Sequence, residues 1–197
     1  MATRRPSRSL LLALLPLAAA AIGACGSDAE VAENQPAGEA SAPAAAPGKD
    51  LPRPLAENRA QANQLIDGGT DALEEKLAQL EGHPVVVNQW GSWCPPCRAE
   101  FPFFAELADE HADEVAFLGV DIQDDREAAE EFLAEFPTPY PHIYDRDAEA
   151  VESLDWAGFS PTTWFIDERG EVAFTRNGAY PDQGTLNADI NLYLLQG

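Results

Sequence analysis

Apolar and polar residues follow regular helix and strand periods from about residue 61 to the end of the chain. Three leucines recur at the spacing that places side chains on one face of a helix, namely Leu73, Leu77 and Leu80. Gly82 and Pro84 predict the end of that helix. The run VVVNQW at 85–90 is apolar and β-branched at its start, and it predicts a strand covered on both faces.

The remaining pattern continues the alternation. It predicts a helix from the cysteines to about Glu110, a strand over Val115–Ile122, an acidic helix over about Asp125–Phe136, a strand over Tyr140–Tyr144, a short helix near Ala148–Leu154, strands at Thr162–Asp167 and Glu171–Arg176, and a C-terminal helix with Leu186, Ile190 and Leu194 on one face. Because Pro139 and Pro141 cannot donate to a ladder, the strand beside them is expected at a sheet edge. The order predicts an α/β fold with a central mixed sheet flanked by helices.

The N-terminal residues have the layout of a secretory leader. Three arginines at positions 4, 5 and 8 precede an apolar run at 10–23, which is shorter than the roughly 20 residues of a membrane-spanning helix. The end of this run, Ile22-Gly23-Ala24-Cys25, resembles a bacterial lipobox. That resemblance implies cleavage before Cys25 and attachment of a lipid to its sulfur. An ordinary secretory signal or an uncleaved anchor is the alternative interpretation.

Residues 25–60 are rich in Ala, Pro, Gly and Glu and contain few large apolar side chains. Such a segment buries too little surface to offset its chain entropy, so we expect a flexible tether. The predicted organisation is therefore a lipoprotein-type signal at 1–24, a lipidated tether at 25–60 and a folded domain at 61–197.

The charge balance narrows the classes of partner. The chain carries 12 Lys and Arg against 34 Asp and Glu, a formal net charge of −22. A surface this acidic repels phosphate backbones and anionic head groups, so nucleic acid is not expected as a partner. The lipid, and not the charge, would hold the chain at a membrane.

The candidate chemistry lies in two of the three cysteines, Cys94 and Cys97. They follow a predicted strand and begin a predicted helix, where free backbone N–H groups and the helix dipole stabilise a thiolate. This predicts Cys94 as the nucleophile and Cys97 as the thiol that resolves the mixed disulfide. Pro95 and Pro96 suit the first helical positions because proline has no N–H to lose there.

Metal sites are the competing interpretation. Zinc requires four ligands, and besides this cysteine pair the chain offers only His83, His111 and His142, at spacings that match no zinc finger. The carboxylates from Asp124 to Glu131 lack the glycine and the oxygen spacing of a calcium loop and predict a solvated helix face. No metal and no external cofactor are expected.

The segment WGSWCPPCRAEFP at 90–102 resembles the active site of the thioredoxin superfamily, and more narrowly of the TlpA/ResA-like thiol-disulfide oxidoreductases. The strand VVVNQW, the sequence SPTT at 160–163 and the segment WFIDERGEV at 164–172 extend the resemblance over roughly residues 61–197. It implies a thioredoxin-like fold. The 39 residues between Asp121 and Pro161 leave room for the extra helix and strand of this branch.

The resemblance also implies roles for single residues. Pro161 would be a cis-proline opposite the disulfide, with the backbone of Ser160 pairing with a bound peptide, and Trp93 would shape the substrate surface together with Trp90. Glu100 would tune thiol acidity and move protons, or it would merely favour the helix dipole. Asn88 stands where many thioredoxins carry a buried acid, and Phe159 stands where the family usually has glycine.

The function implied is disulfide exchange outside the cytoplasm by a membrane-anchored protein. The substrates would be disulfides of exported proteins such as apocytochrome c, and a membrane thiol-transfer protein would donate the electrons. Two alternatives are a thiol peroxidase, although the Thr-x-x-Cys motif of peroxiredoxins is absent, and a non-catalytic binding module or copper chaperone.

Overall fold

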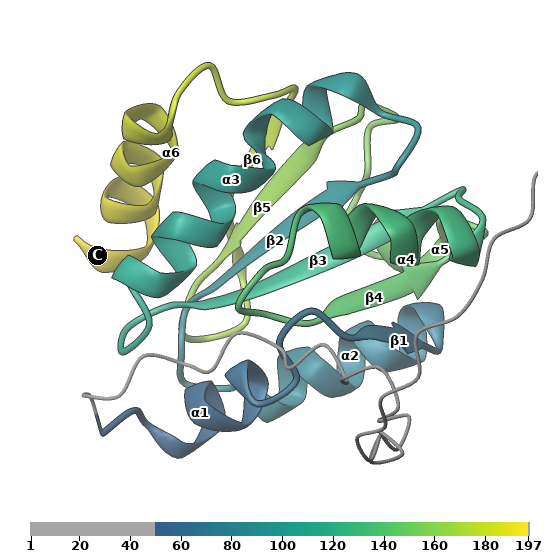
Figure 1. Ribbon diagram of the computed structural model, residues 1–197. Coiled ribbons are helices and arrows are strands. Elements are labelled where there is room, and N and C mark those ends of the chain that lie inside the picture. The colour runs from purple at the N-terminus through teal and green to yellow at the C-terminus, as the bar shows by residue number, and fades with distance from the viewer. Residues whose placement is uncertain (1–49, 197) are drawn as a thin grey trace, which may run out of the picture. The chain divides into compact units, whose positions relative to one another are not determined.

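The computed structural model describes residues 50–196 (Figure 1). The predicted leader, Cys25 and most of the predicted tether lie outside these residues. Within the described part of the chain, no helix combines the length and apolar character needed to cross a membrane.

The described chain alternates helices and strands. The elements are α1 (Arg53–Arg59), β1 (Leu65–Asp67), α2 (Gly69–Gln79), β2 (Val85–Trp90), α3 (Pro95–Glu110), β3 (Ala116–Ile122), α4 (Arg126–Glu135), β4 (His142–Asp145), α5 (Glu149–Glu152), β5 (Thr162–Ile166), β6 (Val172–Asn177), α6 (Gln183–Ile190) and a π-helical segment η1 (Asn191–Leu195).

The strands form one mixed sheet in the order β1-β4-β3-β2-β5-β6. Strands β1 to β4 pair in parallel, whereas β5 runs antiparallel to both β2 and β6. The predicted α/β fold with a mixed sheet is confirmed. The extra helix and strand expected before the proline are α4 and β4, and the short helix α5 follows them.

Helices cover both faces of the sheet. On one face, leucines of α2 and small apolar residues of the short helix α5 pack with Val87, Val120 and Trp164. On the other face, α3 and α6 pack around Val86 and Phe165, and α3 and α4 enclose Trp90. Figure 1 shows α3 and α4 lying across the same side of the central strands. Strands β2 and β3 are buried along their whole length, as their continuous apolar pattern predicts.

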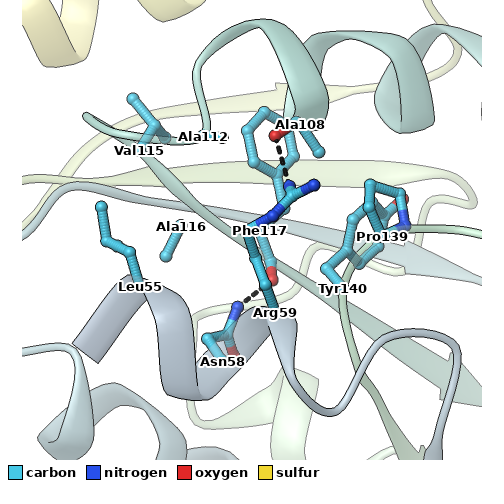
Figure 2. Close-up of a pocket in the computed structure, with 10 residues that line it drawn as sticks. All are labelled: Leu55, Asn58, Arg59, Ala108, Ala112, Val115, Ala116, Phe117, Pro139 and Tyr140. Atoms are coloured by element: carbon cyan, nitrogen blue, oxygen red, sulfur yellow. Dashed lines mark hydrogen bonds between the residues drawn. The ribbon is translucent and has the colours of Figure 1, made fainter. Parts of the chain in front are cut away.

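The predicted tether ends too late, because residues 53–59 form helix α1. Leu55 is buried in the core, Asn58 donates to the carbonyl of Phe117 at 3.0 Å, and Arg59 donates to the carbonyl of Ala108 at 2.8 Å. Figure 2 shows these side chains around a small pocket between α1 and the ends of α3 and β3. A single leucine in a polar, proline-containing stretch gave no helical period to detect.

The prediction that the strand at Tyr140–Tyr144 lies at a sheet edge is also wrong. Strand β4 lies between β1 and β3, and the three-residue strand β1 forms the edge. Both Pro139 and Pro141 precede β4, so they remove no ladder donor from it. The edge strand was missed because three residues are too few to show a period.

Candidate active site

The end of β2 leads through a short loop to the first turn of α3, and this places both cysteines. Cys94 is the N-cap of α3, and its sulfur accepts a hydrogen bond from the backbone N–H of Cys97 at 3.3 Å. Pro95 and Pro96 occupy the first two helical positions, where a missing N–H costs nothing. The helix is 16 residues long, so its N-terminal dipole favours negative charge at Cys94.

Cys94 and Cys97 form a disulfide, with their Cα atoms 5.3 Å apart. Cys94 is 2% exposed and Cys97 is fully buried, so Cys94 is the more exposed of the two. The pair packs in one cluster with Trp90, Phe101 and Phe132. Rings of this cluster contact one another closely, with the Trp90 and Phe132 centroids 4.8 Å apart. The disulfide therefore packs against a cluster of aromatic side chains.

The Ser160–Pro161 peptide bond is cis, as the resemblance implies. Thr162, the next residue, pairs with Gln89 at the end of β2, so the cis bond lies at the sheet end from which the active-site loop departs. Within residues 50–196 the backbone of Ser160 makes no hydrogen bond, whereas the carbonyls of its neighbours Phe159 and Pro161 are both occupied. An unpaired backbone edge of this kind can pair with an extended peptide.

Glu100 is fully buried one turn beyond Cys97. Its Oε1 accepts a hydrogen bond from Asn88 at 3.1 Å, and its Oε2 accepts one from the backbone N–H of Tyr180 at 2.8 Å. Burial raises the pKa of this carboxyl to about 7, although both hydrogen bonds and the charge of Arg176 oppose the rise. A buried carboxyl that titrates near neutrality can exchange protons with a nearby thiol.

Asn88 contributes directly to this arrangement. Besides binding Glu100, its Nδ2 donates to Thr163 Oγ1 at 3.3 Å, and its own Oδ1 has no partner among the described residues. Asn88 is therefore a hydrogen-bond donor to the acid on α3.

The two tryptophans differ in position. Trp93 is 48% exposed beside the disulfide and donates its indole N–H to the carbonyl of Ile122 at 3.2 Å. Trp90 is fully buried and donates to His142 Nδ1 at 3.1 Å, so only Trp93 covers the surface. Phe159 is also exposed, at 57%, which adds an aromatic ring next to the cis bond.

Sequence reasoning missed Asp124. It is buried, not part of a solvated helix face, and it accepts hydrogen bonds from the N–H and hydroxyl of Ser92 at 2.5 and 2.9 Å. Ser92 lies two residues before Cys94, so this carboxylate holds the loop that carries the nucleophile. No local spacing marks the pair, because 32 residues separate them.

His142 is a buried residue of the core. Its Nδ1 accepts from Trp90, its Nε2 lies 2.7 Å from Thr138 Oγ1, and burial lowers its pKa to about 3, so the ring is neutral. His111 contacts Asn187 at the far end of α3. Between residues 50 and 196, no three His, Cys, Asp or Glu side chains converge as a metal site would require.

Comparison with known proteins agrees with this geometry. The Redoxin family model matches residues 55–190. Thiol-disulfide oxidoreductase ResA of Oceanobacillus iheyensis is 33% identical over 115 residues, which are 58% of this chain and 59% of that protein. The chain thus spans less than two thirds of that relative's length.

Solved structures show the same fold. A thiol:disulfide interchange protein DsbE from Chlorobium tepidum superposes with a TM-score of 0.54 at 26% identity, covering 58% of this chain and 82% of that one. A secreted thiol-disulfide isomerase from Corynebacterium glutamicum superposes with a TM-score of 0.52 at 28% identity, covering 56% and 71% of the respective chains. Both likenesses support a thioredoxin-like architecture.

Proposed function

This chain belongs to the redoxin family, and from that membership we propose that it is a thiol-disulfide oxidoreductase acting through Cys94 and Cys97. The observation that carries the proposal is the disulfide at the first turn of α3, at the sheet end where the backbone of Ser160 is unpaired. The reactive sulfur of Cys94 and the proposed peptide-binding backbone of Ser160 thus lie at the same end of the sheet.

The proposed reaction transfers two electrons. In the reduced enzyme the Cys94 thiolate attacks a substrate disulfide, forms a mixed disulfide and releases one substrate sulfur as thiolate. Cys97 loses its proton and attacks the Cys94 sulfur, which re-forms the enzyme disulfide and releases the second substrate thiolate. The substrate is reduced by two electrons and the enzyme is oxidised. A dithiol donor then reduces the Cys94–Cys97 disulfide, is itself oxidised to a disulfide and returns the enzyme to its reduced form.

Glu100 is the proposed proton acceptor for Cys97. It lies three residues beyond Cys97 on the same helix, is buried and has a pKa near neutrality, so it can take and return one proton per cycle. Trp93, Ser160 and Pro161 are the proposed substrate contacts. No cofactor beyond the disulfide takes part in this scheme.

The cellular location, the substrates and the electron donor are proposed from the sequence and its relatives. We place the protein outside the cytoplasm, held at the membrane by a lipid on Cys25, where it reduces disulfides of exported proteins such as apocytochrome c. A membrane thiol-transfer protein would supply the electrons. The similar thiol-disulfide isomerase of Corynebacterium glutamicum is a secreted protein, which supports this location.

The test is an equilibrium redox titration of the full chain, purified in detergent, in thiol buffers of defined potential. Tryptophan fluorescence and mass-spectrometric thiol counting follow the pair. We expect one two-electron transition near or below about −270 mV, typical of a reductant, whereas a value near about −120 mV would overturn the reductive direction. The variant Cys97→Ser should accumulate mixed disulfides with a disulfide-bonded peptide.

Two controls separate the alternatives. Cys25→Ser should leave the redox transition unchanged and remove the lipid mass, which tests the anchor independently. Consumption of hydrogen peroxide by Cys94 that persists in Cys97→Ser would favour a peroxidase. Failure of the pair to cycle would leave a binding module, and copper titration against the same variant would then decide that role.

A further inference from the structure

Asp121 is a buried acid that the proposed chemistry does not use. It lies near the end of β3, opposite Trp90 on β2 and Tyr144 on β4. Its side chain is fully buried, and neither carboxyl oxygen has a hydrogen-bond donor among the described residues. Trp90, its register partner, gives its indole N–H to His142 instead. An ionised carboxylate without donors in such a place is strongly disfavoured.

The group that Asp121 does meet is another carboxyl, that of Asp124. Asp124 already accepts the N–H and hydroxyl of Ser92 and the N–H of Asp125 at 2.9 Å, so it is the carboxyl of the two that has donors around it. Two adjacent carboxyl groups of which one is surrounded by donors and the other by none share a single proton. That proton belongs on Asp121, where it can be donated to Asp124.

We propose that Asp121 is a positioning residue for the active site: its protonated carboxyl donates to Asp124 and thereby holds Asp124 as the acceptor for Ser92, two residues before Cys94. Trp93 is tied to the same strand end through the carbonyl of Ile122. The loop that carries the nucleophile is thus fastened to the end of β3 at two successive residues.

The charged groups around Asp121 agree with a protonated state. Burial, the charge of Asp124 and the charge of Asp145 all raise its pKa, which reaches about 9, and only Arg126 opposes them. Arg126 is itself paired with Asp67 and Glu130 and lies over the ring of Tyr144. The Tyr144 hydroxyl donates to the backbone carbonyl of Asp124 and so does not reach Asp121 as a donor.

Loss of the proton has a defined consequence. Once Asp121 ionises, Asp124 loses a donor and gains a like charge beside it, so its hold on Ser92 weakens. The inference rests on the proposed function only in that the loop serves Cys94. The arrangement itself can be measured in the disulfide form, in which no active-site thiol titrates.

The first experiment is an NMR titration of the oxidised full chain in detergent from about pH 6 to about pH 10. We expect the Ser92 amide resonance to shift with an inflection well above neutrality, and Asp121→Asn to abolish that inflection while keeping the chain folded. The exposed Asp125→Asn is the matched control and should retain it. A flat Ser92 resonance in the wild type, or an unchanged inflection in Asp121→Asn, would overturn the proposal.

The second experiment measures the rate at which dithiothreitol reduces the disulfide. The asparagine amide still donates to Asp124, so Asp121→Asn should match the wild type within about twofold at neutral pH, and the two should diverge several-fold above about pH 9. Equal rates at every pH would remove the link to reactivity. If the wild type itself does not cycle, the proposed function fails, while the NMR titration still decides the carboxyl pair.

Discussion

The backbone N–H of Tyr180 donates to Oε2 of Glu100 at 2.8 Å, joining residues 80 positions apart in the chain. The contact ties the first turns of α3, next to Cys97, to the connection between β6 and α6. Tyr180 is in turn fixed by its hydroxyl, which donates to Asp189 at 2.9 Å, and by Arg176 over its ring. The acid beside the thiols is therefore positioned by the C-terminal part of the fold.

Glu100→Gln should flatten the pH dependence of thiol reactivity around neutrality. The wild-type carboxyl has a pKa of about 7 and changes charge in this range, whereas glutamine does not titrate. The measurement is the alkylation rate of the reduced chain between about pH 5 and about pH 9. Glu106→Gln, on the exposed side of α3, is the control. Unchanged profiles for both variants would remove Glu100 from the proton path.

The same variant should gain stability relative to the wild type as the pH rises. The folded pKa of Glu100 exceeds its ordinary value of 4.5, so the unfolded chain binds fewer protons between about pH 4.5 and pH 7 and wild-type stability falls across that window. Glutamine fits because Asn88 can rotate its unpaired Oδ1 toward the new amide. Urea unfolding measures the difference in unfolding free energy between Glu100→Gln and the wild type. From pH 4 to pH 8 this difference should shift in favour of the variant by up to about 3 kcal/mol. The opposite trend would contradict the burial assigned to the carboxyl.

Asn88→Asp should move the titration of Glu100 to higher pH. The substitution replaces a donor to Glu100 by a second carboxyl in a buried site, so ionising both groups becomes unfavourable. We expect the inflection in thiol reactivity to shift upward by at least about one pH unit and the unfolding midpoint in urea to fall. An inflection that stays in place would mean that the Asn88 contact does not influence the acid.

Gly119→Ala should destabilise the fold without touching the disulfide. A Cβ at this position would lie 1.9 Å from Nδ1 of His142, the atom that accepts from Trp90. Overpacking of this kind costs about 1–3 kcal/mol, and urea unfolding should register it. Gly170→Ala is an informative comparison, since its added Cβ meets nothing and only its positive φ is unfavourable. A neutral Gly119→Ala would show that the His142 ring can move freely.

His142 should make the protein sensitive to acid. Its folded pKa of about 3 lies below the ordinary value of 6.5, so the unfolded chain binds the extra proton between these values and stability falls as the pH drops through that window. His142→Asn should show a shallower loss of unfolding free energy between about pH 6 and pH 4. Equal slopes for the variant and the wild type would indicate that the histidine is accessible to protons in the folded state.

Sequence reasoning placed the residues around the cysteines correctly in the fold, and their catalytic roles stay predictions. Cys94, Cys97 and Glu100 lie within two helical turns, so strand pattern, proline positions and helical spacing were enough to place them. The cis bond before Pro161 followed from resemblance and not from any local rule. The alternation of buried strands and amphipathic helices likewise predicted the mixed sheet.

What was missed depends on long-range register. The contacts of Ser92 with Asp124 and of Glu100 with Tyr180 join segments that meet because β3, β2, β5 and β6 lie side by side in the sheet. An acidic run looks the same in sequence whether its first carboxylate faces water or the active-site loop. Helix α1 and strand β1 are too short, and one of them too polar, to produce a period.

The contact of Arg59 with the carbonyl of Ala108 has a consequence for orientation. It brings α1, with which the described chain begins, to the last turn of α3, whereas the disulfide occupies the first. A 16-residue helix is about 24 Å long, so the chain enters the domain roughly that far from its sulfurs. Helix α1 therefore lies away from the surface at which we propose that polypeptide substrates bind.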